Sequence, residues 1–150
     1  MTMNEFGLSR ETTVGAYLDP MSGFERKEAV FEIRRDEISG VTSRILPYRF
    51  RMLERQDPGV YLEKSPGAIC PFCPDLIEAL TPRFTPDICA ERRFRRGRAV
   101  LFPNAFPYDR HNAVIALCPD HFVGLDALNT ETMTDGFLLA WEYFERMAEA

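Results

Sequence analysis

The sequence lacks any long apolar run, and lysine and histidine are both scarce, with two residues of each in the chain. No stretch approaches the roughly 20 consecutive apolar residues of a membrane-spanning helix, so we expect no membrane partner. The first 18 residues contain Glu5, Arg10 and Glu11 but no apolar core run, which argues against a secretory signal peptide. We therefore expect a cytoplasmic location, where closely spaced cysteines bind metals or act in catalysis more often than they form disulfides.

The chain is acidic overall, although it contains one strongly basic segment. It has 150 residues and a formal net charge of −5, with 45% hydrophobic and 27% charged residues, as in a soluble globular domain. The segment ERRFRRGR at 91–98 carries five arginines, which suit either a nucleic-acid backbone or a solvated approach to a strand, paired with acidic groups. Because the whole molecule is acidic, we favour the solvated approach and expect no nucleic-acid partner.

Turn residues divide the chain into short elements of both kinds. Residues 1–22 are expected to be loosely ordered, and residues 23–150 are expected to form one domain. Alternating apolar and charged residues predict a strand at 29–35, and β-branched residues predict a second strand at 41–46 after a turn at 36–40. The other predicted elements are a loop at 47–67, a helix at 74–80 capped by Asp75, and strands at 98–104 and 112–119.

The clearest predicted helix covers residues 130–147, near the end of the sequence. Its apolar residues recur at intervals of three and four, as on one face of an amphipathic helix. They are Met133, Phe137, Trp141, Phe144 and Ala148. We expect this apolar stripe to cover one face of the sheet.

Two pairs of metal-ligand residues share one spacing. Cys70 and Cys73 are separated by two residues between prolines, and Cys118 and His121 repeat that spacing. Such a spacing lets one tight turn direct two ligands at a tetrahedral zinc ion, with bonds of about 2.0–2.3 Å. Alternatively, Cys118 is a buried residue at the end of a strand, since free cysteine is often buried. Cys89, the remaining cysteine, is expected to be a small core residue.

We expect this zinc site to be structural, since a full set of protein ligands leaves no open position for water. A redox role for the Cys-x-x-Cys pair is disfavoured, because no strand-then-helix unit surrounds it. The residues alone leave open whether Cys118 is the fourth ligand.

Four segments occur in an order that resembles a known enzyme family. They are EIRRDEISGVTSRI at 32–45, CPFCP at 70–74, LFPNAFPYDRH at 101–111 and CPDH at 118–121. Together they are similar to the amino-terminal half of galactose-1-phosphate uridylyltransferase and its relatives in the histidine-triad superfamily. The resemblance covers about residues 24–147. It implies an α+β fold, with a helix near the carboxyl terminus packed on an antiparallel sheet.

The resemblance also implies a set of zinc ligands. Family members bind zinc through the Cys-x-x-Cys pair and a histidine that matches His121. The fourth family ligand is a histidine in the second half of the enzyme, which these residues do not contain. On this interpretation Cys70, Cys73 and His121 hold the zinc, and Cys118 is only a strand-end residue.

A nucleotide site follows from the same resemblance. Asn104 and Phe106 match a segment that lies against the nucleotide, and Arg44 and Arg49 match phosphate contacts. An asparagine amide can hydrogen-bond a base or ribose, a phenylalanine ring can stack on a base, and arginine suits phosphate. In the rival interpretation the Asn–Phe segment is a strand-end turn with Phe106 in the core, and Arg49 is an exposed strand residue.

The family transfers a nucleoside monophosphate through a nucleophilic histidine, the last residue of a His-Pro-His motif. This sequence has no His-x-His, and His111 matches a strand-entry position, so the nucleophile is absent from these residues. We therefore expect the zinc-bearing half of a hexose-1-phosphate nucleotidyltransferase, an enzyme of carbohydrate metabolism. Its expected partners are a nucleotide sugar or sugar phosphate and either the missing carboxyl-terminal half or a second subunit, as in a homodimer.

A second hypothesis involves no catalysis. The chain could be a free-standing, zinc-stabilised module that binds a nucleotide or another protein. Cys118 would then complete a Cys3His site, because structural zinc is almost always held by four ligands.

Overall fold

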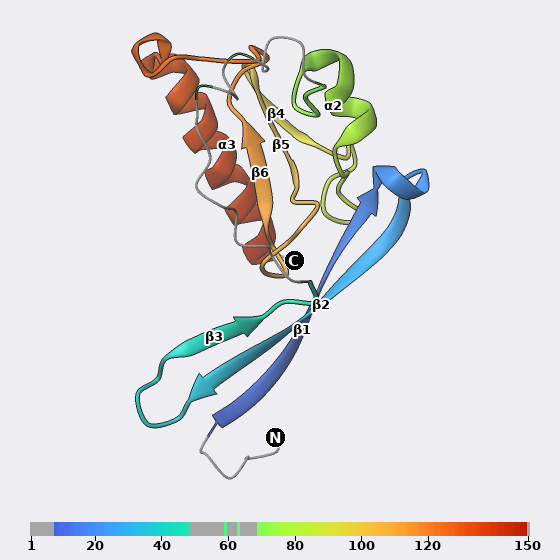
Figure 1. Ribbon diagram of the computed structural model, residues 1–150, viewed down its shortest axis with the longest axis vertical. Helices are drawn as coiled ribbons and strands as arrows, with labels where there is room; N and C mark the ends of the chain where they lie inside the picture. The colour runs from blue at the N-terminus through green and yellow to red at the C-terminus, as the bar shows by residue number, and fades with distance from the viewer. Residues whose placement is uncertain (1–7, 49–58, 60–62, 64–68, 150) are drawn as a thin grey trace.

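The computed structural model describes residues 8–48, 59, 63 and 69–149. In this part of the chain, the strands form two antiparallel sheets with the orders β1-β2-β3 and β4-β5-β6 (Figure 1). The helix nearest the carboxyl terminus, α3 (Thr130–Glu149), lies along the second sheet (Figure 1). This arrangement confirms the predicted α+β class with a packed helix, although the strands divide into two sheets.

The first sheet is built on a long hairpin. Strand β1 (Leu8–Asp19) pairs with β2 (Glu25–Asp36) in antiparallel register over all 12 residues of each strand. A 3-10 helix, η1 (Pro20–Ser22), joins the two strands. Gly23 follows it with φ of 67°, a left-handed conformation that glycine adopts without a steric penalty.

For residues 8–19, strand β1 corrects the prediction of a loosely ordered segment at 1–22, whereas residues 1–7 lie outside the described part of the chain. The segment Leu8–Asp19 has the sequence LSRETTVGAYLD, which is largely polar and shows little strand periodicity. It forms a strand because each of its residues has a partner in β2. The backbone hydrogen bonds of that ladder do not depend on the side-chain pattern, so the partner strand decides the outcome.

The second hairpin of this sheet matches the prediction. Strand β3 (Thr42–Ile45) pairs with β2 after the predicted turn at 36–40. The Asp36 carboxylate stabilises the turn, because it accepts hydrogen bonds from the Ile38 amide at 2.9 Å and the Ser39 hydroxyl at 2.6 Å.

The second sheet carries the core. Its strands are β4 (Phe94–Arg96), β5 (Ala99–Pro103) and β6 (Ala113–Ala116). Strands β5 and β6 confirm the strands predicted at 98–104 and 112–119. The core cluster between this sheet and α3 consists of Phe84, Cys89, Ala99, Leu101, Leu139 and Tyr143. Cys89 is therefore a core residue, as predicted.

The opposite face of β5 carries a different contact. Phe102 points away from Leu101 because side chains alternate along a strand. Its ring stacks on Phe72 with 5.9 Å between ring centroids, and Phe72 lies just before the short helix α2 (Pro74–Leu80). The second sheet is thus covered by α3 on one face and contacted from the α2 side on the other.

Helix α3 (Thr130–Glu149) confirms the predicted element but not its orientation. Its buried residues are Gly136, Leu139 and Tyr143. The predicted stripe faces solvent instead, since Phe137 is 69% exposed and Trp141 is 65% exposed. No helix in the described part of the chain combines the length and apolar character that crossing a bilayer requires.

The reason for this orientation lies in the packing partners of α3. The Tyr143 ring meets the rings of Phe84 and Phe94, with 5.5 and 5.8 Å between centroids. Gly136 leaves room for Leu117, because a Cβ atom at this position would collide with the leucine side chain. The spacing of apolar residues within α3 does not reveal these two contacts, because the partners of Tyr143 and Gly136 lie outside the helix.

The loop between β5 and β6 is attached to the first sheet. Arg44 of β3 forms an ion pair of 2.6 Å with Asp109, and the Tyr48 hydroxyl donates a hydrogen bond to the Pro107 carbonyl. This attachment places the loop at 104–112 beside β3.

Candidate metal centre

The turn that carries the two cysteines leads into a short helix. Helix α2 (Pro74–Leu80) begins after Cys73, its N-cap residue, which has extended backbone angles of φ −67° and ψ 149°. The Cys73 amide donates to the Cys70 carbonyl at 3.2 Å and closes the turn. The Cys73 side chain makes no capping hydrogen bond, so its sulfur is not used by the helix. The prediction that Asp75 caps this helix is wrong, because Asp75 lies inside the first turn.

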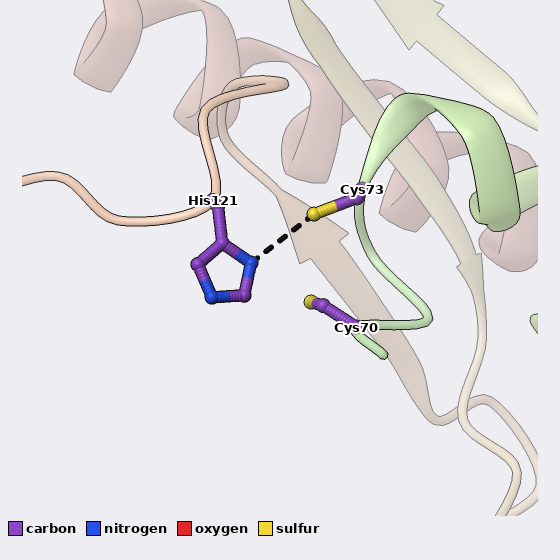
Figure 2. A group of neighbouring side chains, drawn as sticks. All are labelled: Cys70, Cys73 and His121. Carbon is purple, nitrogen blue, oxygen red and sulfur yellow. Dashed lines mark hydrogen bonds between the residues drawn. The ribbon is translucent and has the colours of Figure 1, made fainter. Parts of the chain in front are cut away.

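The third metal-ligand residue, His121, is 48 positions beyond Cys73 in the sequence. It lies in the loop after β6, and its ring points toward the cysteine turn (Figure 2). Its Nδ1 atom is 3.2 Å from the Cys73 sulfur, and the ligand atoms of Cys70, Cys73 and His121 all lie within 4.8 Å of one another. A tetrahedral zinc site has edges of roughly 3.5–3.8 Å, so these three atoms can share one ion after small adjustments.

The surroundings of Cys73 disfavour ionisation of its thiol. Burial raises the pKa of the Cys73 thiol, and the neighbouring Cys70 raises it further. A bound cation reverses this balance, because it stabilises the thiolate form of each ligand. Sulfur and imidazole donors fit a soft or borderline cation, whereas calcium and magnesium prefer oxygen ligands.

Cys118 lies beside this group but does not belong to it. Among the residues that the structure describes, the group with ligand atoms within 4.8 Å of one another consists of Cys70, Cys73 and His121. Cys118 lines a pocket of about 310 Å³ together with these three residues. It is half-buried and follows the end of β6 at Ala116 by two positions.

The predicted nucleotide residue Asn104 is engaged within its own loop. Its Nδ2 atom donates to the Asn112 side-chain oxygen at 2.8 Å, and its Oδ1 atom accepts from the Phe106 amide at 3.0 Å. Phe106 is 60% exposed, and its ring meets Tyr48 edge-on at 5.9 Å between centroids. The rival placement of Phe106 in the core is therefore wrong, while Asn104 forms the strand-end turn that this interpretation describes.

The other predicted residues of this region have separate surroundings. Arg44 is paired with Asp109, and Arg49 lies outside the described residues. His111 is half-buried at the far end of the loop, where burial lowers its pKa and Arg110 lowers it further. The two histidines of the chain are thus placed apart, one in this loop and one in the metal-ligand group.

The basic segment at 91–98 makes its contacts within the chain. Its exposed arginines form ion pairs with acidic residues, namely Arg95 with Glu78, Arg96 with Asp135 and Arg98 with Asp120. These pairs fit a solvated strand with acidic partners. Arg93 is different, because its side chain is only 2% exposed and contacts α2. The sequence does not reveal this role, because nothing in a basic run distinguishes one buried arginine from its neighbours.

Comparison with known proteins finds a longer relative whose activity is not described. The chain is 35% identical over 129 residues to an uncharacterized protein of Archaeoglobus fulgidus. The match covers 85% of this chain and 38% of that protein, so the chain spans well under half the length of this relative. No protein-family model matches the chain, and no solved structure matches it.

Proposed function

We propose that Cys70, Cys73 and His121 bind a structural zinc ion, and that the chain is the zinc-bearing part of a nucleotidyltransferase similar to galactose-1-phosphate uridylyltransferase. The observation that carries this proposal is the convergence of these three ligands within 4.8 Å, in a group without Cys118. The family pattern requires this set of three. A free-standing Cys3His module also requires Cys118, so the geometry favours the nucleotidyltransferase hypothesis over that module.

The zinc ion would stabilise the fold by joining two distant segments. When bound, it supplies a cross-link between the turn before α2 and the loop after β6. Because such a site exists only in the folded chain, its binding free energy adds to folding stability. The fourth ligand would come from polypeptide other than these 150 residues.

A nucleotide sugar would contact the loop at 104–112 and the neighbouring strand β3. Phe106 and Tyr108 present rings that are 60% and 46% exposed, and an exposed ring can stack on a base. Arg44 would approach phosphate by exchanging its partner Asp109. Asn104 would shape the loop through its two hydrogen bonds.

The reaction would be nucleotidyl transfer by double displacement through a covalent histidine intermediate. The nucleophile would lie outside these residues, since His121 faces the two cysteines and His111 is half-buried. The relative from Archaeoglobus, of which the match covers 38%, is long enough to include such a segment.

Zinc content and nucleotide binding test the proposal. We expect about one zinc ion per chain by elemental analysis. We also expect UDP-glucose to shift the NMR signals of Phe106, Tyr108 and β3 in the zinc-loaded protein. The Phe106→Ala variant should weaken this binding roughly 5- to 150-fold, since stacking contributes about 1–3 kcal/mol per base. Zinc uptake without nucleotide binding would favour a free-standing module that binds another protein, and a protein without zinc would contradict both hypotheses.

A further inference from the structure

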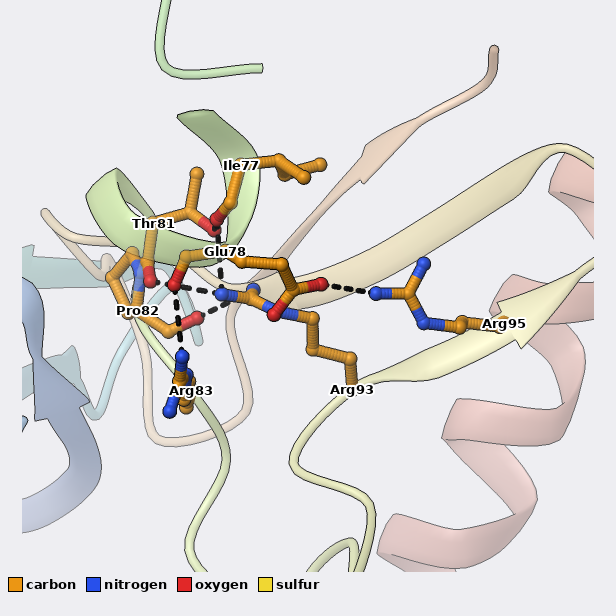
Figure 3. A network of polar contacts seen from close by, with 7 residues as sticks. All are labelled: Ile77, Glu78, Thr81, Pro82, Arg83, Arg93 and Arg95. Carbon is orange, nitrogen blue, oxygen red and sulfur yellow. Dashed lines mark hydrogen bonds and ion pairs between the residues drawn. The ribbon is translucent and has the colours of Figure 1, made fainter. Parts of the chain in front are cut away.

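A buried arginine holds the end of α2 that lies away from the cysteines. Arg93 comes from the segment just before β4. Its Nη2 atom donates to the carbonyls of Ile77 and Thr81, both at 3.1 Å, and its Nη1 atom donates to the Pro82 carbonyl at 2.8 Å (Figure 3). Its Nε atom pairs with the Glu78 carboxylate at 3.2 Å. We call these contacts the Arg93 clamp.

The clamp binds carbonyl groups at the end of α2 and just beyond it. The last carbonyls of a helix need outside donors, and a cation there also interacts favourably with the helix dipole. The Thr81 hydroxyl adds a hydrogen bond of 2.6 Å to the Ile77 carbonyl, and Arg83 donates to the Glu78 carbonyl at 3.0 Å. Helix α2 has only 7 residues, so it depends on such outside contacts for its position.

Residues from elsewhere in the chain therefore hold both ends of α2. At its start, the ligand atoms of Cys70 and Cys73 lie beside His121. At its end, Arg93 binds the Ile77 carbonyl, four residues from Cys73. Four residues of helix span about 6 Å, so a tilt of about 10° at Ile77 would move Cys73 by about 1 Å. Metal–ligand bonds tolerate deviations of only about 0.2 Å, so the orientation of α2 matters for metal binding.

We propose that Arg93 is a positioning residue for the metal centre, because its clamp on α2 orients the Cys73 sulfur toward His121. Metal affinity and clamp formation are then thermodynamically linked, and each strengthens the other to the same extent. This inference rests on the proposed metal site. Arg95 supplies an internal contrast, since it pairs with Glu78 from the surface and its side chain is 54% exposed.

Metal titrations of three variants test this inference, with Co²⁺ as the spectroscopic probe and Zn²⁺ as the competitor. Arg93→Met should weaken metal binding about 10- to 100-fold, as changes in residues that support metal ligands do. Arg93→Lys should fall between this variant and the wild type, because lysine keeps the charge but loses the planar fork. Arg95→Met is the matched control and should change affinity by less than about 3-fold, since exposed ion pairs contribute little.

The spectrum separates positioning from general stability. The Co²⁺–thiolate absorption of folded Arg93→Met should differ from that of the wild type, whereas the absorption of Arg95→Met should not. A folded Arg93→Met variant with wild-type affinity and spectrum would overturn the inference, and so would an equal loss in Arg95→Met.

If Arg93→Met does not fold, hydrogen exchange in the wild type tests the linkage between the Arg93 clamp and metal binding. The Thr81 amide donates to the Ile77 carbonyl at 3.3 Å inside the clamp. Its hydrogen exchange should slow on Zn²⁺ binding by a larger factor than that of amides in the β1–β2 hairpin. Equal effects at both places would refute the linkage. Failure of the wild type to bind Co²⁺ or Zn²⁺ would contradict the proposed function itself, whereas binding without linkage would contradict only this inference.

Discussion

Replacing Cys118 by serine should leave zinc binding almost unchanged, whereas replacing Cys73 by serine should severely weaken it. The Cys73 sulfur is 3.2 Å from the His121 ring nitrogen, and Cys118 lies outside the group of converging ligands. Structural zinc binds small domains with about 10–16 kcal/mol, so one of four ligands contributes roughly 2.5–4 kcal/mol. Loss of one ligand should therefore raise Kd by about 100- to 1000-fold. For Cys118→Ser we expect a change of less than about 3-fold, the size of ordinary surface effects.

The two serine variants form a matched pair, because each exchanges one sulfur for one oxygen in a half-buried cysteine. Zinc affinity is measured by competition with a chromogenic chelator, and circular dichroism verifies that both variants are folded. A Cys118→Ser protein that yields its zinc to a mild chelator, while the wild type keeps it, would refute the reasoning. Cys118 would then be the fourth ligand, and the free-standing module would become the better hypothesis.

Three other predictions concern the fold, its pH dependence and catalysis. Leu139→Ala should lower the free energy of unfolding, measured in urea, by about 2–5 kcal/mol, because this side chain is 0% exposed. Trp141→Gln should change the free energy of unfolding by no more than about 0.5 kcal/mol. The reverse order would show that the predicted apolar stripe packs on the sheet after all. Burial alone would raise the pKa of Glu78, but its arginine partners hold that pKa below the ordinary value of 4.5. Ionised Glu78 therefore stabilises the fold fully above pH 4.5, and this stabilisation is lost as the pH falls through its lowered pKa. The difference in unfolding free energy between the wild type and Glu78→Gln should thus shrink on acidification, and a difference that stays constant with pH would contradict this. The 150-residue chain should form no covalent nucleotidyl adduct with labelled UDP-glucose, because neither His111 nor His121 belongs to a His-x-His; an adduct seen by mass spectrometry would disprove this.

The elements that could be predicted are those whose cause is local. The turn at 36–40 is one example, because Asp36 hydrogen-bonds residues two and three positions ahead. Strands β5 and β6 of the second sheet are another, since their apolar and β-branched residues favour extended backbone in most surroundings. The strand Leu8–Asp19 could not be predicted in this way, because its cause is the neighbouring strand β2.

The amino-acid sequence by itself determined which residues can bind a metal, because thiol and imidazole chemistry belongs to the side chain. The spacing of Cys70 and Cys73 also places both residues on one turn. The tertiary structure decided which of the candidates meet, and it brought His121 to that turn while leaving Cys118 outside the group. It also decided which face of α3 is buried and that Arg93, alone among the arginines of its segment, lies buried. These outcomes depend on contacts between residues far apart in the chain, and such contacts leave no periodic or compositional signal in the segments that make them.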